Sequence, residues 1–169
     1  MAVEGGQRAP DFELQGEFDP EKFGFRTYKL SAALEESPVV MHFFPAPFTA
    51  VCQFQMCTVR DRIEDYRAEG ITVWGVTGHY PMMNAQWAKE HEFGVPLLAD
   101  YEHTVSEAYV GTYDDLLGLK HLSKRAVVSI SQDGKVAFVW ITEDPGVAPP
   151  EEVIRQAIDA AKRSKRAAA

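Results

Sequence analysis

The sequence contains only two cysteines, Cys52 and Cys57, in 169 residues. This number excludes both a framework of several disulfides and a four-cysteine zinc site. Four residues separate the two cysteines, which is a C-x4-C spacing. In a chain without the marks of secretion, a pair this close favours either redox chemistry or a purely structural role.

Basic residues are also few: the sequence has 17 lysines and arginines against 25 aspartates and glutamates, which gives a net charge of −8. This charge repels the phosphates of nucleic acids and of anionic lipids, so we expect no nucleic-acid partner and no membrane partner. The histidines lack the spacing of metal ligands, and we expect neither a metal site nor a cofactor. These histidines are His42, His79, His91, His103 and His121.

One long segment lacks charge altogether: residues 37–59 contain no Asp, Glu, Lys or Arg and are numerous enough to span a bilayer. Pro38, Pro45 and Pro47 interrupt this segment, so it is not a membrane helix. The first residues of the sequence also lack the apolar core of a secretory signal. We therefore expect a cytoplasmic protein.

The sequence has no internal repeat and no linker rich in Gly, Ser or Pro. Its 18.9 kDa and 46% hydrophobic content suit an ordinary globular protein. We expect one domain that spans residues 1–169.

Short apolar runs rich in β-branched and aromatic residues predict strands, and amphipathic segments between them predict helices. The predicted strands are residues 39–44, 71–76, 95–99, 126–131 and 135–141. The predicted helices are one that carries the apolar stripe from Cys52 to Tyr66 and stops at Gly70, followed by residues 81–92, 104–109 and 151–163. Residues 132–134, Gln-Asp-Gly, predict a hairpin. This order indicates an α/β fold with a central mixed sheet flanked by helices, which is the thioredoxin-like plan.

Cys52 is expected in the first turn of the helix that follows strand 39–44, with Thr49 as the N-cap. Ligands of open α/β sheets bind beyond the carboxyl ends of the strands. The free N–H groups of a first helical turn and the helix dipole favour a thiolate there. From its position alone, Cys52 is explained equally well as a small buried apolar residue.

Cys57 follows five residues later on the same predicted helix. On a regular helix the two cysteine Cα atoms are about 9 Å apart, whereas a disulfide tolerates roughly 7 Å. A bond between Cys52 and Cys57 therefore requires the first helical turns to unwind. The alternative for Cys57 is a thiol packed in the core beneath the helix.

Residues 45–52, Pro-Ala-Pro-Phe-Thr-Ala-Val-Cys, resemble the Pro-x-x-x-Thr-x-x-Cys signature of the peroxiredoxins, which are thiol peroxidases with a thioredoxin fold. Residues 9–14 resemble the opening strand region of this AhpC/TSA superfamily, and residues 95–100 resemble its Pro-Leu-Leu-x-Asp element. Residues 124–128 stand where the family carries its active-site arginine. The C-x4-C pair most resembles the PrxQ, or bacterioferritin comigratory protein, branch.

The resemblance implies a role for each matching residue. Cys52 would be the peroxidatic nucleophile, with Thr49 and Arg125 as its hydrogen-bonding partners at the peroxide. Pro45 would shield the thiolate from solvent, and Cys57 would be the resolving cysteine. The substrates implied are hydrogen peroxide and small organic hydroperoxides. A thioredoxin- or glutaredoxin-like protein would be the reductant, and the enzyme would be a monomer or a homodimer.

Two features depart from the family pattern. Gln55 stands where most relatives carry a carboxylate, and we expect it to contribute to substrate binding through a bond to Arg125 or to the backbone. Residues 111–122 are longer and richer in leucine than expected, and either cover the site or form a subunit contact. Two other functions stay open: a one-cysteine peroxidase resolved by an external thiol, and a non-enzymatic redox sensor or holdase.

Overall fold

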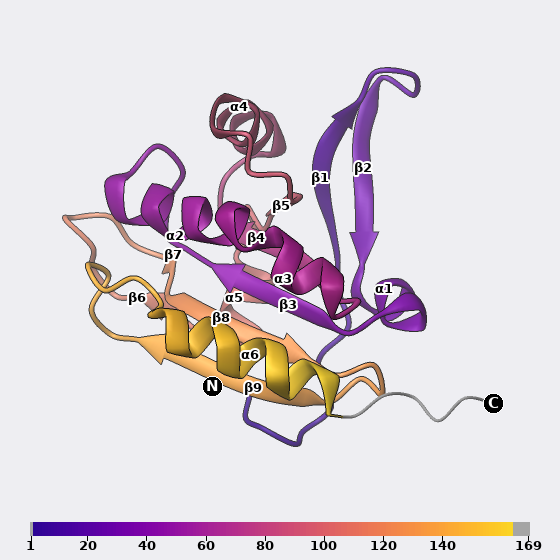
Figure 1. The fold of residues 1–169 in the computed structure, drawn as a ribbon. Helices are drawn as coiled ribbons and strands as arrows, with labels where there is room; N and C mark the ends of the chain where they lie inside the picture. Colours follow the sequence, from indigo (N-terminus) through magenta and orange to yellow (C-terminus); the bar gives the residue numbers. More distant parts are fainter. Residues whose placement is uncertain (1, 164–169) are drawn as a thin grey trace.

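A computed structural model describes residues 2–163, which form a seven-stranded sheet flanked by helices, together with a small two-stranded sheet (Figure 1). Residues 1 and 164–169 of the expected domain lie outside the described residues. The strands are β1 (Glu13–Asp19), β2 (Gly24–Lys29), β3 (Val39–Phe43), β4 (Thr72–Thr77), β5 (Leu97–Ala99), β6 (Thr112–Tyr113), β7 (Leu122–Ser123), β8 (Arg125–Ile130) and β9 (Val136–Thr142). The helices are α1 (Leu30–Glu36), α2 (Ala50–Asp61), α3 (Ile63–Ala68), α4 (Pro81–His91), α5 (Thr104–Tyr109) and α6 (Glu151–Lys162).

The large sheet has the order β2-β1-β5-β4-β3-β8-β9. Strands β3, β4 and β5 are parallel neighbours, whereas β8 and β9 run antiparallel beside β3. The α/β fold with a mixed sheet and flanking helices is therefore confirmed. Within residues 2–163, no helix has both the length and the apolar character needed to cross a membrane.

Each face of the sheet has its own hydrophobic core. Residues of α2, α3, α4 and α6 pack on one face, and residues of α1 and α5 pack on the other. Strand β3 supplies both cores because its side chains alternate, so that Val40 faces the first core while Met41 and Phe43 face the second. All five residues of β3 are buried, as expected of a central strand covered on both sides.

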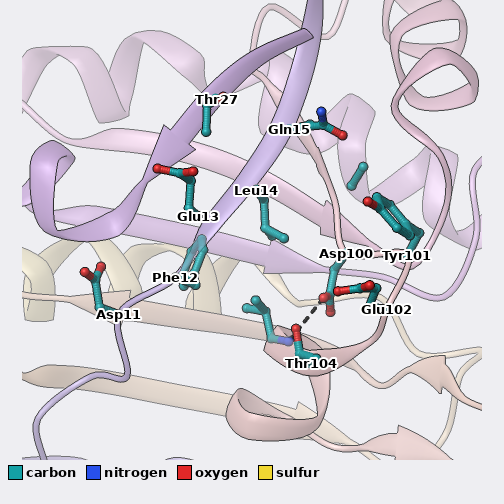
Figure 2. A pocket seen from close by; sticks show the side chains of 12 residues that line it. Asp11, Phe12, Glu13, Leu14, Gln15, Thr27, Asp100, Tyr101, Glu102 and Thr104 are labelled. Carbon is teal, nitrogen blue, oxygen red and sulfur yellow. Dashed lines mark hydrogen bonds between the residues drawn. The ribbon is translucent and has the colours of Figure 1, made fainter.

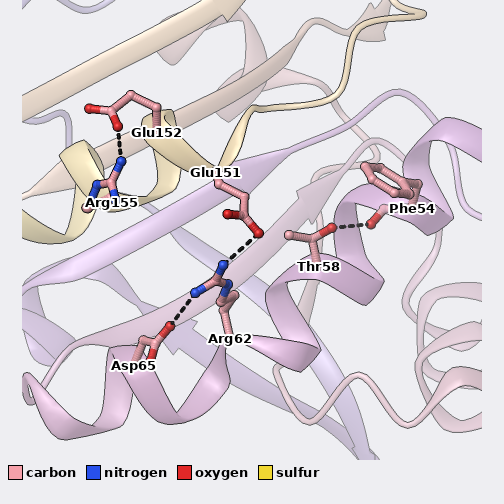
Figure 3. A network of polar contacts seen from close by, with 7 residues as sticks. All are labelled: Phe54, Thr58, Arg62, Asp65, Glu151, Glu152 and Arg155. Carbon is pink, nitrogen blue, oxygen red and sulfur yellow. Dashed lines mark hydrogen bonds and ion pairs between the residues drawn. The ribbon is translucent and has the colours of Figure 1, made fainter.

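The helix predicted from Cys52 to Tyr66 is in fact two helices, α2 and α3, which meet at Arg62. The Arg62 side chain bonds to Asp65 at 3.3 Å and to Glu151 of α6 at 2.6 Å (Figure 3). These exposed ion pairs link the break to the last helix. Gly70 ends α3 as predicted, with φ at +65°, a conformation that favours glycine.

Candidate active site

The junction of β3 and α2 brings distant parts of the chain together. Strand β8 pairs antiparallel with β3, and Phe43 at the end of β3 lies opposite Ala126. Arg125, the first residue of β8, therefore reaches the place where the chain leaves β3 and enters α2. Between the two elements, Phe48 has φ at +61°, a backbone conformation that is rare for an aromatic residue and common at functional sites.

Cys52 lies in the first turn of α2 and is 1% exposed. The first backbone bond of the helix runs from the N–H of Gln53 to the carbonyl of Thr49 at 2.8 Å. The N–H groups of Ala50, Val51 and Cys52 precede this bond and lack an acceptor within the helix. Such groups favour a negative charge on the Cys52 sulfur.

Arg125 contacts this sulfur directly. Both terminal guanidinium nitrogens of Arg125 lie 3.5 Å from the Sγ of Cys52. The arginine is 2% exposed, although it carries a full charge. A buried cation needs hydrogen-bond acceptors around it, because its charge has lost its water.

Neutral oxygens hold the guanidinium in place. The carbonyl of Pro145 accepts from Nε at 3.1 Å and from one terminal nitrogen at 2.7 Å. The side-chain oxygen of Gln55 accepts from the other terminal nitrogen at 2.8 Å. The hydroxyl of Tyr113 accepts from the backbone N–H of Arg125 at 3.2 Å and donates to the carbonyl of Thr142 at 3.0 Å. Among the described residues, no carboxylate forms an ion pair with Arg125.

Gln55 is buried beside Arg125 and is not one of the residues that line the cavity at Cys52. Its amide nitrogen donates to the carbonyl of Phe43 at 3.3 Å, while its amide oxygen accepts from Arg125. An ionised glutamate has no proton to donate to the Phe43 carbonyl. The amide therefore satisfies both the Phe43 carbonyl and Arg125. Gln55 acts on the site through its bond to Arg125 and does not line the cavity.

Thr49 occupies the N-cap position of α2, as predicted, but its side chain makes no capping bond. Its hydroxyl instead donates to the carbonyl of Ala46 at 2.8 Å. The lone pairs of this oxygen stay available to accept a hydrogen bond from a molecule beside Cys52. Pro45 is buried, and its carbonyl accepts from the hydroxyl of Thr77 at 3.3 Å.

A cavity of about 280 Å³ opens over Cys52. Its lining includes the predicted residues Pro45, Thr49, Cys52 and Arg125, which the fold thus brings together. Four leucines of residues 111–122 also line the cavity, so this stretch borders the site. We call them the leucine wall: Leu116, Leu117, Leu119 and Leu122.

Cys57 is half-buried and packs against the core beneath α2. Both cysteines are free thiols on one continuous helix. Arg60 follows one turn later, and its pKa is raised by its hydrogen bond to Asp61 and then by the charge of Cys57. The carbonyl of His91 also accepts from Arg60, at 2.9 Å.

A second cavity lies where β1 and β5 meet the start of α5 (Figure 2). Its lining includes Asp11, Glu13 and Glu102, and also Asp100, whose buried carboxylate accepts from the backbone N–H groups of Val105 and Ser106. The carboxylate of Asp100 thus accepts hydrogen bonds from the free N–H groups of the first turn of α5. The described residues contain no group of three His, Cys, Asp or Glu side chains arranged to hold a metal ion.

Residues 5–139 match the AhpC/TSA family. This chain belongs to that family, the peroxiredoxins. It is 28% identical over 142 residues to peroxiredoxin Bcp of Bacillus subtilis, which covers 83% of this chain and 86% of that protein. It is 32% identical over 138 residues to a putative peroxiredoxin of Mycobacterium tuberculosis, covering 82% and 85% of the two chains. The crystal structure of peroxidoxin BcpB from Mycobacterium tuberculosis superposes with a TM-score of 0.78 at 26% identity, over 97% of this chain and 99% of that one.

The family assignment and the thioredoxin-like fold of this peroxiredoxin are therefore confirmed, and the protein is a thiol peroxidase by family. Sequence reasoning missed Pro145 and Tyr113, which hold Arg125. Pro145 acts through a backbone carbonyl, so its residue type gives no signal. Tyr113 lies in the stretch of residues 111–122, where the sequence indicated no strand, and only the hairpin of β6 and β7 places its hydroxyl beside β8.

Proposed function

We propose that this peroxiredoxin reduces hydroperoxides through Cys52 and resolves the oxidised cysteine with Cys57. The observation that best supports this proposal is the position of the Cys52 sulfur, which lies at the N-terminus of α2 and 3.5 Å from both terminal nitrogens of Arg125. A cation and free N–H groups around one sulfur favour its thiolate form. The thiolate is the nucleophile in attack on a peroxide.

In the first step the Cys52 thiolate attacks the terminal oxygen of the hydroperoxide. A sulfur–oxygen bond forms, the O–O bond breaks, and the other oxygen leaves with the electron pair and takes up a proton. The products are a sulfenic acid on Cys52 and water or an alcohol. Arg125 supports this step because its N–H groups face the place where negative charge moves from sulfur to the leaving oxygen.

Thr49 and Pro45 would orient the substrate and limit water. The hydroxyl of Thr49 donates to Ala46 and so presents an acceptor to the O–H of the incoming hydroperoxide. Holding the O–O bond in line with the sulfur converts an encounter of two molecules into a positioned reaction. Gln55 acts on the same reaction indirectly, as a positioning residue for the guanidinium.

Cys57 would then attack the sulfenic sulfur of Cys52, which forms the disulfide and releases water. The regular helix holds the two Cα atoms about 9 Å apart, so α2 must unwind at its start. The burial of this segment favours unwinding, because Cys52 is the only buried residue between Phe48 and Phe54. A segment with so little buried apolar surface opens at low cost.

A dithiol protein of the thioredoxin or glutaredoxin type would reduce this disulfide and return both thiols. Exposure of the unwound segment would give the reductant access to the sulfur atoms. The substrates proposed are hydrogen peroxide and small organic hydroperoxides.

The decisive experiment compares peroxide turnover by the wild-type protein, Cys52→Ser and Cys57→Ser with a thioredoxin system. Cys52→Ser is expected to lose turnover, and Cys57→Ser to lose it unless a small thiol is added. After one equivalent of peroxide, the mass of the wild type is expected to fall by two hydrogens. Full activity in Cys52→Ser contradicts the proposal. A stable gain of one oxygen in the wild type assigns resolution to an external thiol, and absence of turnover in all three proteins favours a redox sensor.

A further inference from the structure

The hairpin of β6 and β7, which carries the leucine wall, also reaches the large sheet where β8 begins and β9 ends. The hydroxyl of Tyr113 in β6 accepts from the backbone N–H of Arg125 at 3.2 Å and donates to the carbonyl of Thr142 at 3.0 Å. Arg125 and Thr142 face each other as the first pair of the β8–β9 ladder. One hydroxyl therefore connects the residue that begins β8 with the residue that ends β9.

The surroundings of Tyr113 suit a hydroxyl that bridges two groups. The residue is 6% exposed, so water competes little for its hydrogen bonds. Burial raises the pKa of this phenol, and the hydroxyl therefore keeps the proton that it donates to Thr142. A phenylalanine at this position would keep the ring but would leave the Arg125 N–H and the Thr142 carbonyl without this partner.

Thr142 is also the start of the turn that carries the Pro145 carbonyl. The Thr142 hydroxyl donates to the carbonyl of Asp144 and accepts from the N–H of Asp144, both at 3.1 Å. The carboxylate of Asp144 then accepts from the N–H of Gly146 at 2.8 Å. These bonds fix the backbone on both sides of Pro145, whose carbonyl accepts from Nε and one terminal nitrogen of Arg125.

A second contact joins the same two segments, but it is exposed. The ammonium of Lys124 lies 2.6 Å from the carboxylate of Glu143, whose side chain is 80% exposed. Solvent and salt screen such an ion pair, so it restrains the two segments only weakly. The hydroxyl of Tyr113 is therefore the stronger of these two restraints between the start of β8 and the end of β9.

We infer that Tyr113 is a positioning residue for the attack of Cys52 on peroxide. Its hydroxyl holds the backbone of Arg125 and the turn of Pro145 at a fixed separation, and these two points together orient the guanidinium. This inference rests on the proposed function of Cys52. An arginine side chain has many rotamers, so a fixed backbone and a fixed acceptor are both needed to keep its nitrogens 3.5 Å from the sulfur. Without the hydroxyl the guanidinium shifts relative to the O–O bond, and the alignment of the reacting atoms is lost.

The test is Tyr113→Phe, which keeps the aromatic ring and removes only the hydroxyl. A displacement of about 1 Å in an active site costs about a hundredfold in rate, and for a smaller shift we expect the rate constant of Cys52 with hydrogen peroxide to fall about tenfold. Alkylation of Cys52 by iodoacetamide should fall less than about threefold, because this reaction has no O–O bond to align with the guanidinium. Both rate constants are measured in the Cys57→Ser background, where Cys52 is the only cysteine.

Tyr109 offers a matched control. It is a buried tyrosine of α5 whose hydroxyl donates to the backbone carbonyl of Pro10. The variant Tyr109→Phe thus removes a buried phenolic hydroxyl that has no hydrogen bond to Arg125 or Thr142. Urea unfolding should show a comparable loss of stability in the two phenylalanine variants, whereas the peroxide rate constant of Tyr109→Phe should stay within about twofold of the wild type.

Two further variants show whether the effect passes through the guanidinium. In an Arg125→Lys background, Tyr113→Phe should change the peroxide rate constant by less than about twofold, because the group that Tyr113 orients is then absent. Thr142→Val removes the hydroxyl that holds the turn of Pro145 but leaves the Tyr113 bonds in place. Thr142 is only half-buried, so this variant is expected to fold, and its peroxide rate constant should fall severalfold.

Four outcomes overturn the inference. One is a peroxide rate constant in Tyr113→Phe equal to that in Tyr109→Phe. Another is an equal fall in the reactions with peroxide and iodoacetamide, which would mean a general loss of structure at Cys52. The third is a full tenfold effect of Tyr113→Phe in the Arg125→Lys background, which would make its role independent of the guanidinium. The fourth is a wild-type rate constant in Thr142→Val, whether or not Tyr113→Phe folds. In each case the proposed function survives alone, whereas turnover of hydrogen peroxide that persists in Cys52→Ser contradicts the proposed function itself.

Discussion

Arg125 holds both of its terminal nitrogens 3.5 Å from the sulfur of Cys52, and among the described residues it forms no ion pair with a carboxylate. Its other acceptors are the amide oxygen of Gln55 and the carbonyl of Pro145. Within residues 2–163, the sulfur is therefore the only hydrogen-bond partner of the guanidinium that can become an anion. Because the arginine is almost fully buried, its charge is screened little by solvent, and the thiolate is its natural counter-ion.

Replacing Arg125 by lysine is expected to slow the reaction of Cys52 with hydrogen peroxide by about a hundredfold, the usual cost of one transition-state donor. Lysine keeps the charge but cannot span the sulfur, Gln55 and Pro145 with one planar group. Stopped-flow measurement of the second-order rate constant tests this. The exposed Arg155→Lys on α6 is the matched control, with no change expected. A rate within twofold of the wild type in Arg125→Lys would show that charge alone is sufficient.

Replacing Gln55 by glutamate is expected to weaken the pairing of Arg125 with the thiolate, because a second anion then competes for the guanidinium. The rate constant for the reaction of Cys52 with hydrogen peroxide should therefore fall severalfold relative to the wild type. The glutamate also leaves the Phe43 carbonyl without its donor, which costs about 1–3 kcal/mol of stability.

The control for this change is Gln53→Glu, which adds the same charge two residues away, at a half-buried position that is not among the hydrogen-bond partners of the Arg125 side chain. Rate profiles over pH 5–8 and urea unfolding of both variants give the comparison. Equal profiles for the two variants would mean that Gln55 acts through the general field of the site and not through its bond to the arginine.

The β3–α2 junction was predictable because a continuous apolar run and a regular apolar stripe give strong local signals there. The β1–β2 hairpin was missed because β1 has mixed burial, a register shift between Gln15 and Phe18, and Gly16 in its middle. A Cβ at Gly16 would lie 2.6 Å from the ring of Tyr28, a contact that no local pattern reveals. The break at Arg62 has no Pro or Gly to mark it. Only the resemblance to the family predicted a role for Arg125 at the site, because a single arginine at the end of a strand is by itself no sign of catalysis.

Trp87 should report oxidation of this protein. It is fully buried, and its ring centroid lies 6.1 Å from that of Phe48, which precedes α2. If α2 unwinds so that Cys52 can reach Cys57, Phe48 moves away from Trp87. We expect a change in tryptophan emission after one equivalent of peroxide, reversed by dithiothreitol.

Two variants separate this signal from direct effects of peroxide. Cys57→Ser forms no internal disulfide and should show no slow emission change, although Cys52 still reacts. Phe48→Leu should reduce the change without preventing the disulfide, as judged by mass. An emission change of wild-type size in Cys57→Ser would indicate that sulfenic acid formation alone moves this segment.

His42 in β3 gives the protein a pH-dependent stability that is independent of its redox chemistry. It is completely buried, and burial lowers its pKa to about 3. One ring nitrogen lies 2.9 Å from the hydroxyl of Tyr66, whose own pKa is raised by burial, so this hydroxyl stays protonated. In the unfolded chain a histidine binds a proton below about pH 6.5.

Between pH 6.5 and pH 3 the unfolded state therefore binds more protons than the folded state at this position. The free energy of unfolding must fall as the pH decreases through that range, by up to about 1.4 kcal/mol per pH unit. From pH 6.5 to pH 4.5 we expect a loss of about 2 kcal/mol from His42.

His42→Phe removes the titrating group, so the unfolding free energy of this variant should fall less steeply over the same range even if its stability at pH 7 is lower. The exposed His121→Asn is the control and should follow the wild type. Urea titrations at half-unit intervals of pH measure these slopes, and parallel slopes for wild type and His42→Phe would mean that the buried imidazole is protonated in the folded state above pH 4.5.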